Sequence, residues 1–305
     1  MSDVKLFKVV PKVQPIELKA SRLERDIQKL IETNMETFFG VRFLQSEYVI
    51  SHSDDYEALG GRIDSLGIDE NNCPIVFEYK RDTNENVINQ GLFYLDWLLD
   101  HQADFWRLVM EKLGKQVADA IDWGSPAVYC VANAFGKYDL HAIKQVNRNI
   151  RLVRYANGGD IVLFEFLNAP STISPSLDTP IRKLNGRVYS DKTFAEQYAG
   201  TTDQLREIVD EVRQYMCTFG DDVSENELKL YLAIKKARNI VCVEVNRKRV
   251  ILHLAIDPTT IEETALVCDA SKKGHWGTGD VEVSLTSIED LEEAKPLLER
   301  AYMEN

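Results

Sequence analysis

Two acidic residues and a lysine, Asp64, Glu78 and Lys80, lie on two neighbouring segments with the composition of β-strands. The segment 70–72 between them has the composition of a turn. An antiparallel hairpin centred on Asn71 places Asp64 directly opposite Glu78, because the two residues are equally far from that centre. Directly opposed side chains lie about 5 Å apart on one face. Lys80, two residues beyond Glu78, shares that face.

Two carboxylates at that separation repel each other unless one is protonated or a cation lies between them. Mg²⁺ suits such a pair, since it takes few carboxylates and keeps several waters. A divalent cation there can polarise a phosphodiester oxygen and lower the pKa of a bound water. Lys80 can orient that water or stabilise charge that develops on the phosphate. The spacing therefore predicts metal-dependent hydrolysis of phosphodiesters, with Mg²⁺ or Mn²⁺ as cofactor.

The same pattern is also typical of a surface ion pair between Lys80 and either Asp64 or Glu78. The residues before Glu78, Ile75-Val76-Phe77, form a nearly continuous apolar run. Such a run predicts a strand buried on both faces, where unpaired charges are costly. This context favours a functional site over a solvated ion pair.

The stretch GGRIDSLGIDENNCPIVFEYKR, followed by NQGLFY, closely resembles the PD-(D/E)XK nuclease superfamily. It is most similar to the branch related to NucS-type endonucleases and RecB-type nuclease domains. The resemblance covers Ile16 to Leu167 and implies a restriction-endonuclease-like mixed sheet flanked by helices. It also implies that Asp64, Glu78 and the backbone carbonyl of Tyr79 bind the metal, and that Lys80 assists the water.

Three further catalytic residues are implied by the resemblance. The Gln-x-x-x-Tyr signature of the RecB-like branch matches Gln90 and Tyr94, which lie one helical turn apart on one face. The glutamate that the family places on its first helix is best matched by Glu24. An alternative stays open for each, because Ser21 and Glu24 also form a capping box, and Gln90 and Tyr94 can be buried polar groups of the core. In one departure from the motif, Ile63 stands where proline is usual.

The expected substrate is a nucleic acid, with DNA favoured over RNA, in repair, restriction or defence. The candidate nucleic-acid contacts are Lys19, Arg22, Arg62, Arg81, Lys272, Lys273 and Trp276. In the glycine-flanked loop around Trp276 the ring can stack on a base, or else pack back on the core. For each basic residue alone, solvated surface charge is the alternative. The net charge of −13 does not support a broad positive surface that coats DNA.

The periodicity of the chain predicts an α/β fold in two domains. Residues 1–168 form the nuclease-like domain, residues 169–200 a linker rich in Pro, Ser and Thr, and residues 201–305 a smaller α+β accessory domain. The first domain is expected to contain helices at 15–40, 84–113 and 138–147, and strands at 41–52, 62–69, 74–80, 127–132, 150–155 and 161–166. The second is expected to contain helices at 203–215, 224–237 and 287–302, and strands at 240–245, 250–255 and 280–285. This second domain resembles an uncharacterised domain found fused behind such nucleases, and that resemblance supplies no activity.

The composition excludes several other classes of protein. The five cysteines are scattered without a CxxC pair, which argues against a disulfide framework and against structural zinc. No apolar run reaches the roughly 18 residues that span a bilayer, and the N-terminus lacks the apolar segment of a signal peptide. A cytoplasmic protein without a membrane partner is expected, and a homodimer stays open. The rival hypothesis is a catalytically silent module of nuclease fold that binds nucleic acid or a protein.

Overall fold

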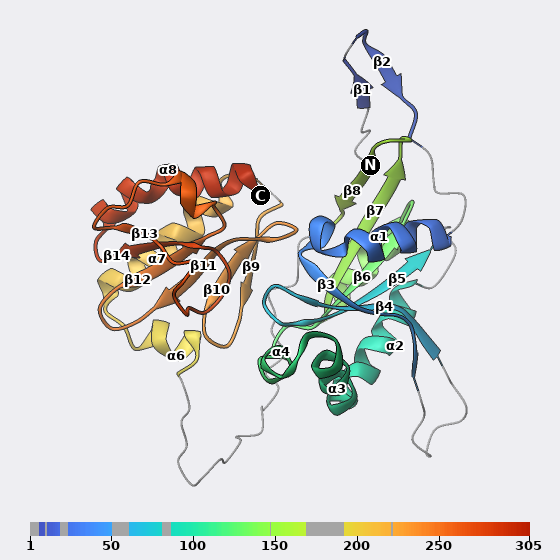
Figure 1. Cartoon of the computed structure of the whole chain (residues 1–305), viewed down its shortest axis with the longest axis horizontal. Coiled ribbons are helices and arrows are strands. Elements are labelled where there is room, and N and C mark those ends of the chain that lie inside the picture. The colour runs from blue at the N-terminus through green and yellow to red at the C-terminus, as the bar shows by residue number, and fades with distance from the viewer. Residues whose placement is uncertain are drawn as a thin grey trace.

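The computed structural model of the chain describes residues 6–9, 11–18, 24–50, 61–80, 87–146, 148–168, 192–220 and 222–305. Two six-stranded sheets, one in each half of the chain, organise two units (Figure 1). A third, two-stranded sheet near the N-terminus pairs β1 (Leu6–Lys8) with β2 (Gln14–Ile16). The helix predicted from residue 15 is therefore wrong at its start, because that residue belongs to β2. None of the described helices is both long and apolar enough to cross a membrane.

The N-terminal sheet has the strand order β3-β4-β5-β6-β7-β8 and mixed pairing. Its strands are β3 (Val41–Ile50), β4 (Gly61–Asp69), β5 (Pro74–Lys80), β6 (Ala127–Ala132), β7 (Asn149–Asn157) and β8 (Val162–Phe166). The pairs β5–β6 and β6–β7 are parallel, and the other pairs are antiparallel. Helix α1 (Glu24–Phe39) packs on one face, and α2 (Val87–Asp100) and α3 (Gln102–Leu113) pack on the other. The predicted mixed α/β sheet with helices on its faces is confirmed at this level.

The β4–β5 hairpin has the predicted register. Leu66 lies opposite Val76, and Ile68 lies opposite Pro74. Alternate residues of β5 enter different cores: Val76 contacts the α2 side, whereas Phe77 belongs to the core under α1. All of β5 except its last residue is buried, as its apolar run predicted.

Between β5 and β7 the helices are shorter than predicted. The helix expected at 84–113 is divided at His101, whose backbone leaves the helical region (φ −114°, ψ 41°). The ring of His101 stacks on Trp97 at 4.2 Å, and its Nδ1 lies 2.8 Å from the carbonyl oxygen of Trp97. Short helices α4 (Lys115–Asp119) and α5 (Lys137–Ala142) and a 3₁₀ turn (Ile143–Gln145) follow.

The C-terminal sheet is antiparallel, with the strand order β13-β14-β12-β11-β10-β9. Its strands are β9 (Ser224–Glu227), β10 (Leu232–Lys235), β11 (Asn239–Val245), β12 (Val250–Leu254), β13 (Val267–Asp269) and β14 (Val281–Leu285). Helices α7 (Asp203–Cys217) and α8 (Ile288–Glu304) share one core with it, and a 3₁₀ turn (Pro258–Thr260) follows β12. Figure 1 shows both helices on one side of this sheet.

Two predictions for this half are wrong. The segment 224–237 is not a helix but the strands β9 and β10, joined by a turn in which the amide of Leu228 donates to the carbonyl of Tyr231. Leu232 and Ile234 point into the helix-covered core, whereas Ala233 points to the opposite face, so the period is two. The predicted linker, 169–200, is shorter at its C-terminal end. Residues 194–199 form α6, and Phe194 is buried in the C-terminal core.

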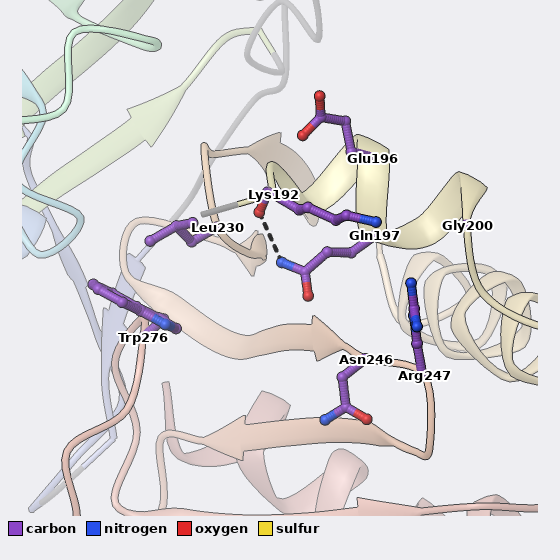
Figure 2. Close-up of a pocket in the computed structure, with 8 residues that line it drawn as sticks. All are labelled: Lys192, Glu196, Gln197, Gly200, Leu230, Asn246, Arg247 and Trp276. Atoms are coloured by element: carbon purple, nitrogen blue, oxygen red, sulfur yellow. Dashed lines mark hydrogen bonds between the residues drawn. The ribbon is translucent and has the colours of Figure 1, made fainter. Parts of the chain in front are cut away.

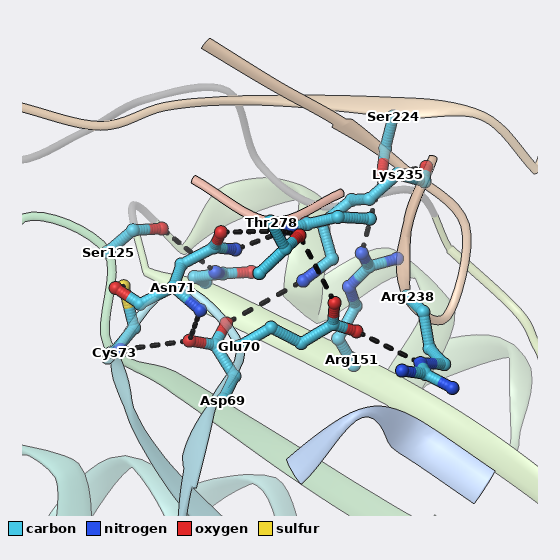
Figure 3. Close-up of polar contacts among 12 residues, drawn as sticks. Asp69, Glu70, Asn71, Cys73, Ser125, Arg151, Ser224, Lys235, Arg238 and Thr278 are labelled. Atoms are coloured by element: carbon cyan, nitrogen blue, oxygen red, sulfur yellow. Dashed lines mark hydrogen bonds and ion pairs between the residues drawn. The ribbon is translucent and has the colours of Figure 1, made fainter. Parts of the chain in front are cut away.

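The helix-free face of the C-terminal sheet contacts the turn of the β4–β5 hairpin (Figure 3). Asn71 of that turn is buried, and its Oδ1 accepts hydrogen bonds from Tyr231 Oη at 2.9 Å and Asn239 Nδ2 at 2.6 Å. Beside it, the ammonium of Lys235 lies 3.7 Å from the carboxylate of Asp69. The C-terminal unit thus fixes the turn of the strand pair on which Asp64 and Glu78 lie.

Candidate active site

Asp64 and Glu78 lie where β4 and β5 stop pairing. The backbone pairing of the two strands ends at Ser65 and Phe77. One residue further, the carboxyl groups take over as hydrogen-bond acceptors: Glu78 Oε1 accepts from the amide of Asp64 at 3.3 Å, and Asp64 Oδ2 accepts from the amide of Tyr79 at 3.0 Å. The two acids are therefore adjacent, as the predicted register required.

Burial governs the protonation of this pair. Glu78 is 2% exposed, and burial together with the charge of Asp64 raises its pKa to about 9. Burial also raises the pKa of Asp64, while the amide of Tyr79 and the ammonium of Lys80 oppose that rise. Near neutral pH Glu78 therefore holds its proton as long as no cation compensates its charge.

Lys80 and Glu24 meet at the edge of this pair. Lys80 Nζ lies 4.0 Å from Glu24 Oε1, and the two side chains are 15% and 39% exposed. The charge of Lys80 lowers the pKa of both Asp64 and Glu78, so the ammonium faces the acids. The contact with Lys80 favours a site role for Glu24. Ser21, its partner in the alternative capping box, lies outside the described residues.

The two residues of the Gln-x-x-x-Tyr signature are placed differently. Tyr94 is buried, and its Oη accepts a hydrogen bond from the amide of Arg62 at 3.3 Å. Burial raises the pKa of Tyr94, and the charges of Glu78 and Asp64 raise it further, so the phenol lies near the acids. Gln90 is exposed and forms no hydrogen bond with a described residue. The alternative that Gln90 is a buried polar group of the core is therefore wrong. In its exposed position the side chain of Gln90 is accessible to a substrate.

Gly61 allows Tyr94 to reach this position. A Cβ added at Gly61 would lie 2.7 Å from the ring of Tyr94 and 3.1 Å from Ile50. Real Cβ atoms do not approach other atoms that closely, so a larger residue would displace the ring. Gly61 is therefore part of the wall of the site.

Two residues of the site were missed by sequence reasoning. Gln28 of α1 is buried, and its Nε2 donates to the carbonyl of Asp64 at 3.0 Å and to Glu47 Oε1 at 3.4 Å. Glu47 of β3 adopts a positive φ of 53°, and its charge contributes to the raised pKa of Asp64. One feature of the sequence pointed to Gln28: it follows Glu24 by four residues, which places both side chains on one face of a helix.

Comparison with known proteins supplies no activity for either unit. Residues 194–305 match a domain of unknown function (DUF5655). Over 297 residues the chain is 29% identical to an uncharacterised protein of Haemophilus influenzae, and the match covers 92% of this chain and 93% of that protein. The match spans both units, so their combination occurs in that protein as well. No solved structure matches the chain.

Those predicted nucleic-acid contacts that the structure describes are not gathered in one place. Near the acids, Arg62 is exposed and its Nε lies 2.5 Å from Glu47 Oε2. On the C-terminal unit Lys272, Lys273 and Trp276 are exposed, and Lys273 Nζ donates to Cys268 Sγ at 2.9 Å. Lys273 is therefore engaged within its own unit. The other three candidates, Lys19, Arg22 and Arg81, lie outside the described residues.

The donor set suits a hard divalent cation that keeps most of its waters. In the part of the chain that the structure describes, no three His, Cys, Asp or Glu side chains form a group that could hold a metal. The donors that the resemblance predicts are two carboxyl groups, those of Asp64 and Glu78, and the carbonyl of Tyr79. The Tyr79 amide bonds Asp64, and its carbonyl points the same way, because a strand residue directs both groups to one neighbour. Mg²⁺ and Mn²⁺ accept one or two carboxylates plus waters, so the residues fit.

Proposed function

We propose that this protein is a nuclease that hydrolyses phosphodiester bonds with Mg²⁺ or Mn²⁺, and that its N-terminal sheet is of the restriction-endonuclease-like kind. The observation that carries the proposal is the adjacent pair of half-buried Asp64 and buried Glu78 beside Lys80, in which the pKa of Glu78 is raised to about 9. Burying two acids together costs free energy that apolar residues at these positions would not cost. Strongly perturbed carboxyls next to a cationic partner are typical of functional sites.

Each residue has a role in this proposal. Asp64, Glu78 and the Tyr79 carbonyl would hold the cation, which supplies Lewis-acid polarisation of the phosphate and a more acidic water. The ammonium of Lys80 holds the attacking water or stabilises negative charge on the phosphate. Glu24, 4.0 Å from Lys80, orients that ammonium. The substrate is a nucleic acid, with DNA favoured over RNA, in repair, restriction or defence.

A cleavage panel tests this proposal. The full chain is incubated with single- and double-stranded DNA and RNA in Mg²⁺, in Mn²⁺ and in EDTA, and at least one form is expected to be cut only with a cation. Lys80→Met keeps the aliphatic stem but removes the charge, and is expected to lower the rate about 10²- to 10³-fold. Glu36→Gln, on the exposed face of α1, is the matched control and should leave the rate unchanged.

Two outcomes of the panel would count against the proposal. Absence of hydrolysis of every substrate by folded wild-type protein would contradict nuclease activity. If Mn²⁺ still bound at Asp64 and Glu78 in that case, the chain would be a nucleic-acid or protein-binding module that retains the site without turnover. Cleavage that persisted in EDTA would contradict the proposed cofactor.

Cation binding is expected to release about one proton below pH 9, because a carboxylate must be deprotonated to act as a ligand. Glu78, with a pKa of about 9, supplies that proton. Titration calorimetry with Mn²⁺ in two buffers of different ionisation enthalpy measures it. The affinity should rise up to about tenfold per pH unit between roughly pH 6 and 8. A Mn²⁺ affinity that did not change over this range would show that Glu78 is not a ligand.

A further inference from the structure

The indole ring of Trp276 is unusually exposed to solvent for a tryptophan of this protein. Trp276 is 53% exposed, whereas the other three tryptophans of the chain are partly buried against the N-terminal core. It lies in the loop between β13 and β14, a segment with a basic pair and several glycines. An exposed indole leaves a large apolar surface in water, and such surface on a folded protein commonly marks a contact site.

The backbone on both sides of Trp276 is held against the sheet. Its amide donates to Glu244 Oε1 at 3.0 Å, and the amide of Thr278 donates to Cys242 Sγ at 3.3 Å. Gly277 has a φ of +76°, and a Cβ added there would lie 2.6 Å from Cys242, so the loop touches the strand directly. The indole is thus presented on an anchored loop, and little conformational entropy is lost when a ligand stacks on it.

A groove of about 470 Å³ begins at this indole (Figure 2). Its other lining residues come from α6 and the segment before it, from the β9–β10 turn and from the β11–β12 turn: Lys192, Glu196, Gln197, Gly200, Leu230, Asn246 and Arg247. Lys192 and Arg247 are exposed and form no ion pair with a described residue. The carboxylate of Glu196 accepts a hydrogen bond from the amide of Thr193 at 2.9 Å, and Figure 2 shows it directed away from the two cations.

We propose that this groove binds single-stranded nucleic acid, with one base stacked on Trp276 and neighbouring phosphates at Arg247 and Lys192. The inference rests on the proposed function, in which the substrate is a nucleic acid, and it names the form of substrate. The side chains of Gln197 and Asn246 lie between the aromatic and cationic ends and offer donors and acceptors to base edges. A paired base has both faces covered in a duplex, so stacking on Trp276 requires an unpaired base. Aromatic platforms beside cations are the usual means of binding single strands.

The two cations of this groove contrast with the negative net charge of the whole chain. The protein carries a net charge of −13, which repels a polyanion over most of its surface. In the groove two cations face solvent, and its one carboxylate is bound to a backbone amide. A polyanion is therefore attracted locally rather than broadly. Binding should be weakened by salt, in proportion to the small number of phosphates contacted.

Fluorescence anisotropy of a labelled ten-nucleotide oligo(dT), titrated with the full chain in EDTA, tests the groove. Trp276→Ala is expected to weaken binding about 10-fold or more, since one stacked base contributes about 1–3 kcal/mol. Arg247→Ala removes a phosphate contact and is expected to weaken binding and to reduce its salt dependence. Lys248→Ala removes an equally exposed cation from the same turn but outside the groove lining, and is expected to leave the affinity within about twofold. A duplex of the same length should bind more weakly than the single strand. Circular dichroism confirms that each variant is folded.

The outcomes separate this proposal from the nuclease. Trp276-dependent binding in EDTA without any cleavage in Mn²⁺ would support the groove and contradict the nuclease. Cleavage by wild type combined with unchanged affinity in both groove variants would overturn the groove and leave the nuclease intact. Equal loss of affinity in Lys248→Ala would overturn the proposal, because any surface cation would then serve. Light scattering that showed a dimer broken by Trp276→Ala, without oligonucleotide binding, would make this face a subunit interface and overturn it as well.

Discussion

Replacing Glu78 by glutamine is expected to abolish cleavage and, at the same time, to stabilise the metal-free protein at alkaline pH. Both effects follow from one property of the residue: its carboxyl is 2% exposed and adjacent to Asp64, and its pKa is raised to about 9. Replacing a residue that served only stability would not lower activity and raise stability at the same time. The combination is therefore a sharper test of the site than loss of activity alone.

The activity effect comes from the cation. Glutamine keeps the shape of Glu78 and an oxygen that can accept from the amide of Asp64, but it cannot supply a negative charge. The cleavage rate is expected to fall by at least about 10³-fold, as when an electrostatic stabiliser of a transition state is removed. Added Mn²⁺ should raise the melting temperature of wild type and not of the variant, because only wild type binds the ion tightly.

The stability effect has a definite sign. The usual pKa of a glutamate is 4.5, and in the folded chain it is about 9, so the folded state binds this proton more tightly than the unfolded state does. Stability therefore falls as pH rises from about 4.5 to about 9. Glutamine does not ionise and removes that loss. At about pH 8 the metal-free variant should be more stable by roughly 2–5 kcal/mol, the upper figure being the full 3.5 pH units above 4.5 at about 1.4 kcal/mol each.

Thermal unfolding in EDTA at several pH values measures this difference. The melting temperature of Glu78→Gln should exceed that of wild type by at least about 5 °C near pH 8, and the two should converge near pH 4.5. Glu36→Gln, an exposed acid on α1, should show no such pH-dependent gain. A variant that was less stable than wild type across the whole range would show that Glu78 is held by structural bonds instead.

The hairpin that carries these acids was predictable because its determinants are local. A polar turn and two flanking strands define the register, and β5 and β6 begin and end where the sequence placed them, at 74–80 and 127–132. For Gln28 the spacing from Glu24 indicated only the helix face; its hydrogen bonds to Asp64 and Ser46 depend on how α1 crosses β3 and β4 and were not predictable. Contacts of that kind are set by packing between distant segments, which no local pattern encodes.

The C-terminal unit shows where periodicity fails. Leu228, Tyr231 and Leu232 have the i, i+3, i+4 spacing of a helix face, yet they belong to β10 and the turn before it. Short apolar runs satisfy both the helical and the strand period. Here the alternation of Leu232 and Ile234 against Ala233 matches two covered faces, one facing α7 and α8 and one facing the first unit.

The turn at 70–72 was predicted only as a turn, and nothing in its composition marks it as buried. Asn71 is nevertheless 4% exposed, because Tyr231 and Asn239 of the other unit cover it. Polar turn residues are ordinarily solvated. The burial of this one arises from a contact between residues about 160 positions apart in the chain, which a single sequence does not reveal.

Asp69→Ala is expected to cause the largest loss of stability, about 3–5 kcal/mol, because it breaks a buried ion pair and leaves its cation behind. Asp69 is 4% exposed; its Oδ2 lies 3.7 Å from Lys235 Nζ, and its Oδ1 accepts from the amides of Asn71 and Cys73 at 2.9 and 2.8 Å. In the variant Lys235 stays buried beside the like charge of Arg151, without its nearest carboxylate. The melting temperature should fall by about 10 °C.

Two companion variants divide this loss between the turn and the ion pair. Asp69→Asn keeps an oxygen for both amides and removes only the charge, so it should cost less than Asp69→Ala. Lys235→Met removes the cation, and the Asp69→Ala/Lys235→Met double variant should be destabilised by at least about 1 kcal/mol less than the sum of the single losses. Strict additivity in urea unfolding would show that the two charges do not interact. Because Asp69 ends β4 and Lys235 ends β10, a coupled loss means that the pair joins the strand of Asp64 to the C-terminal sheet.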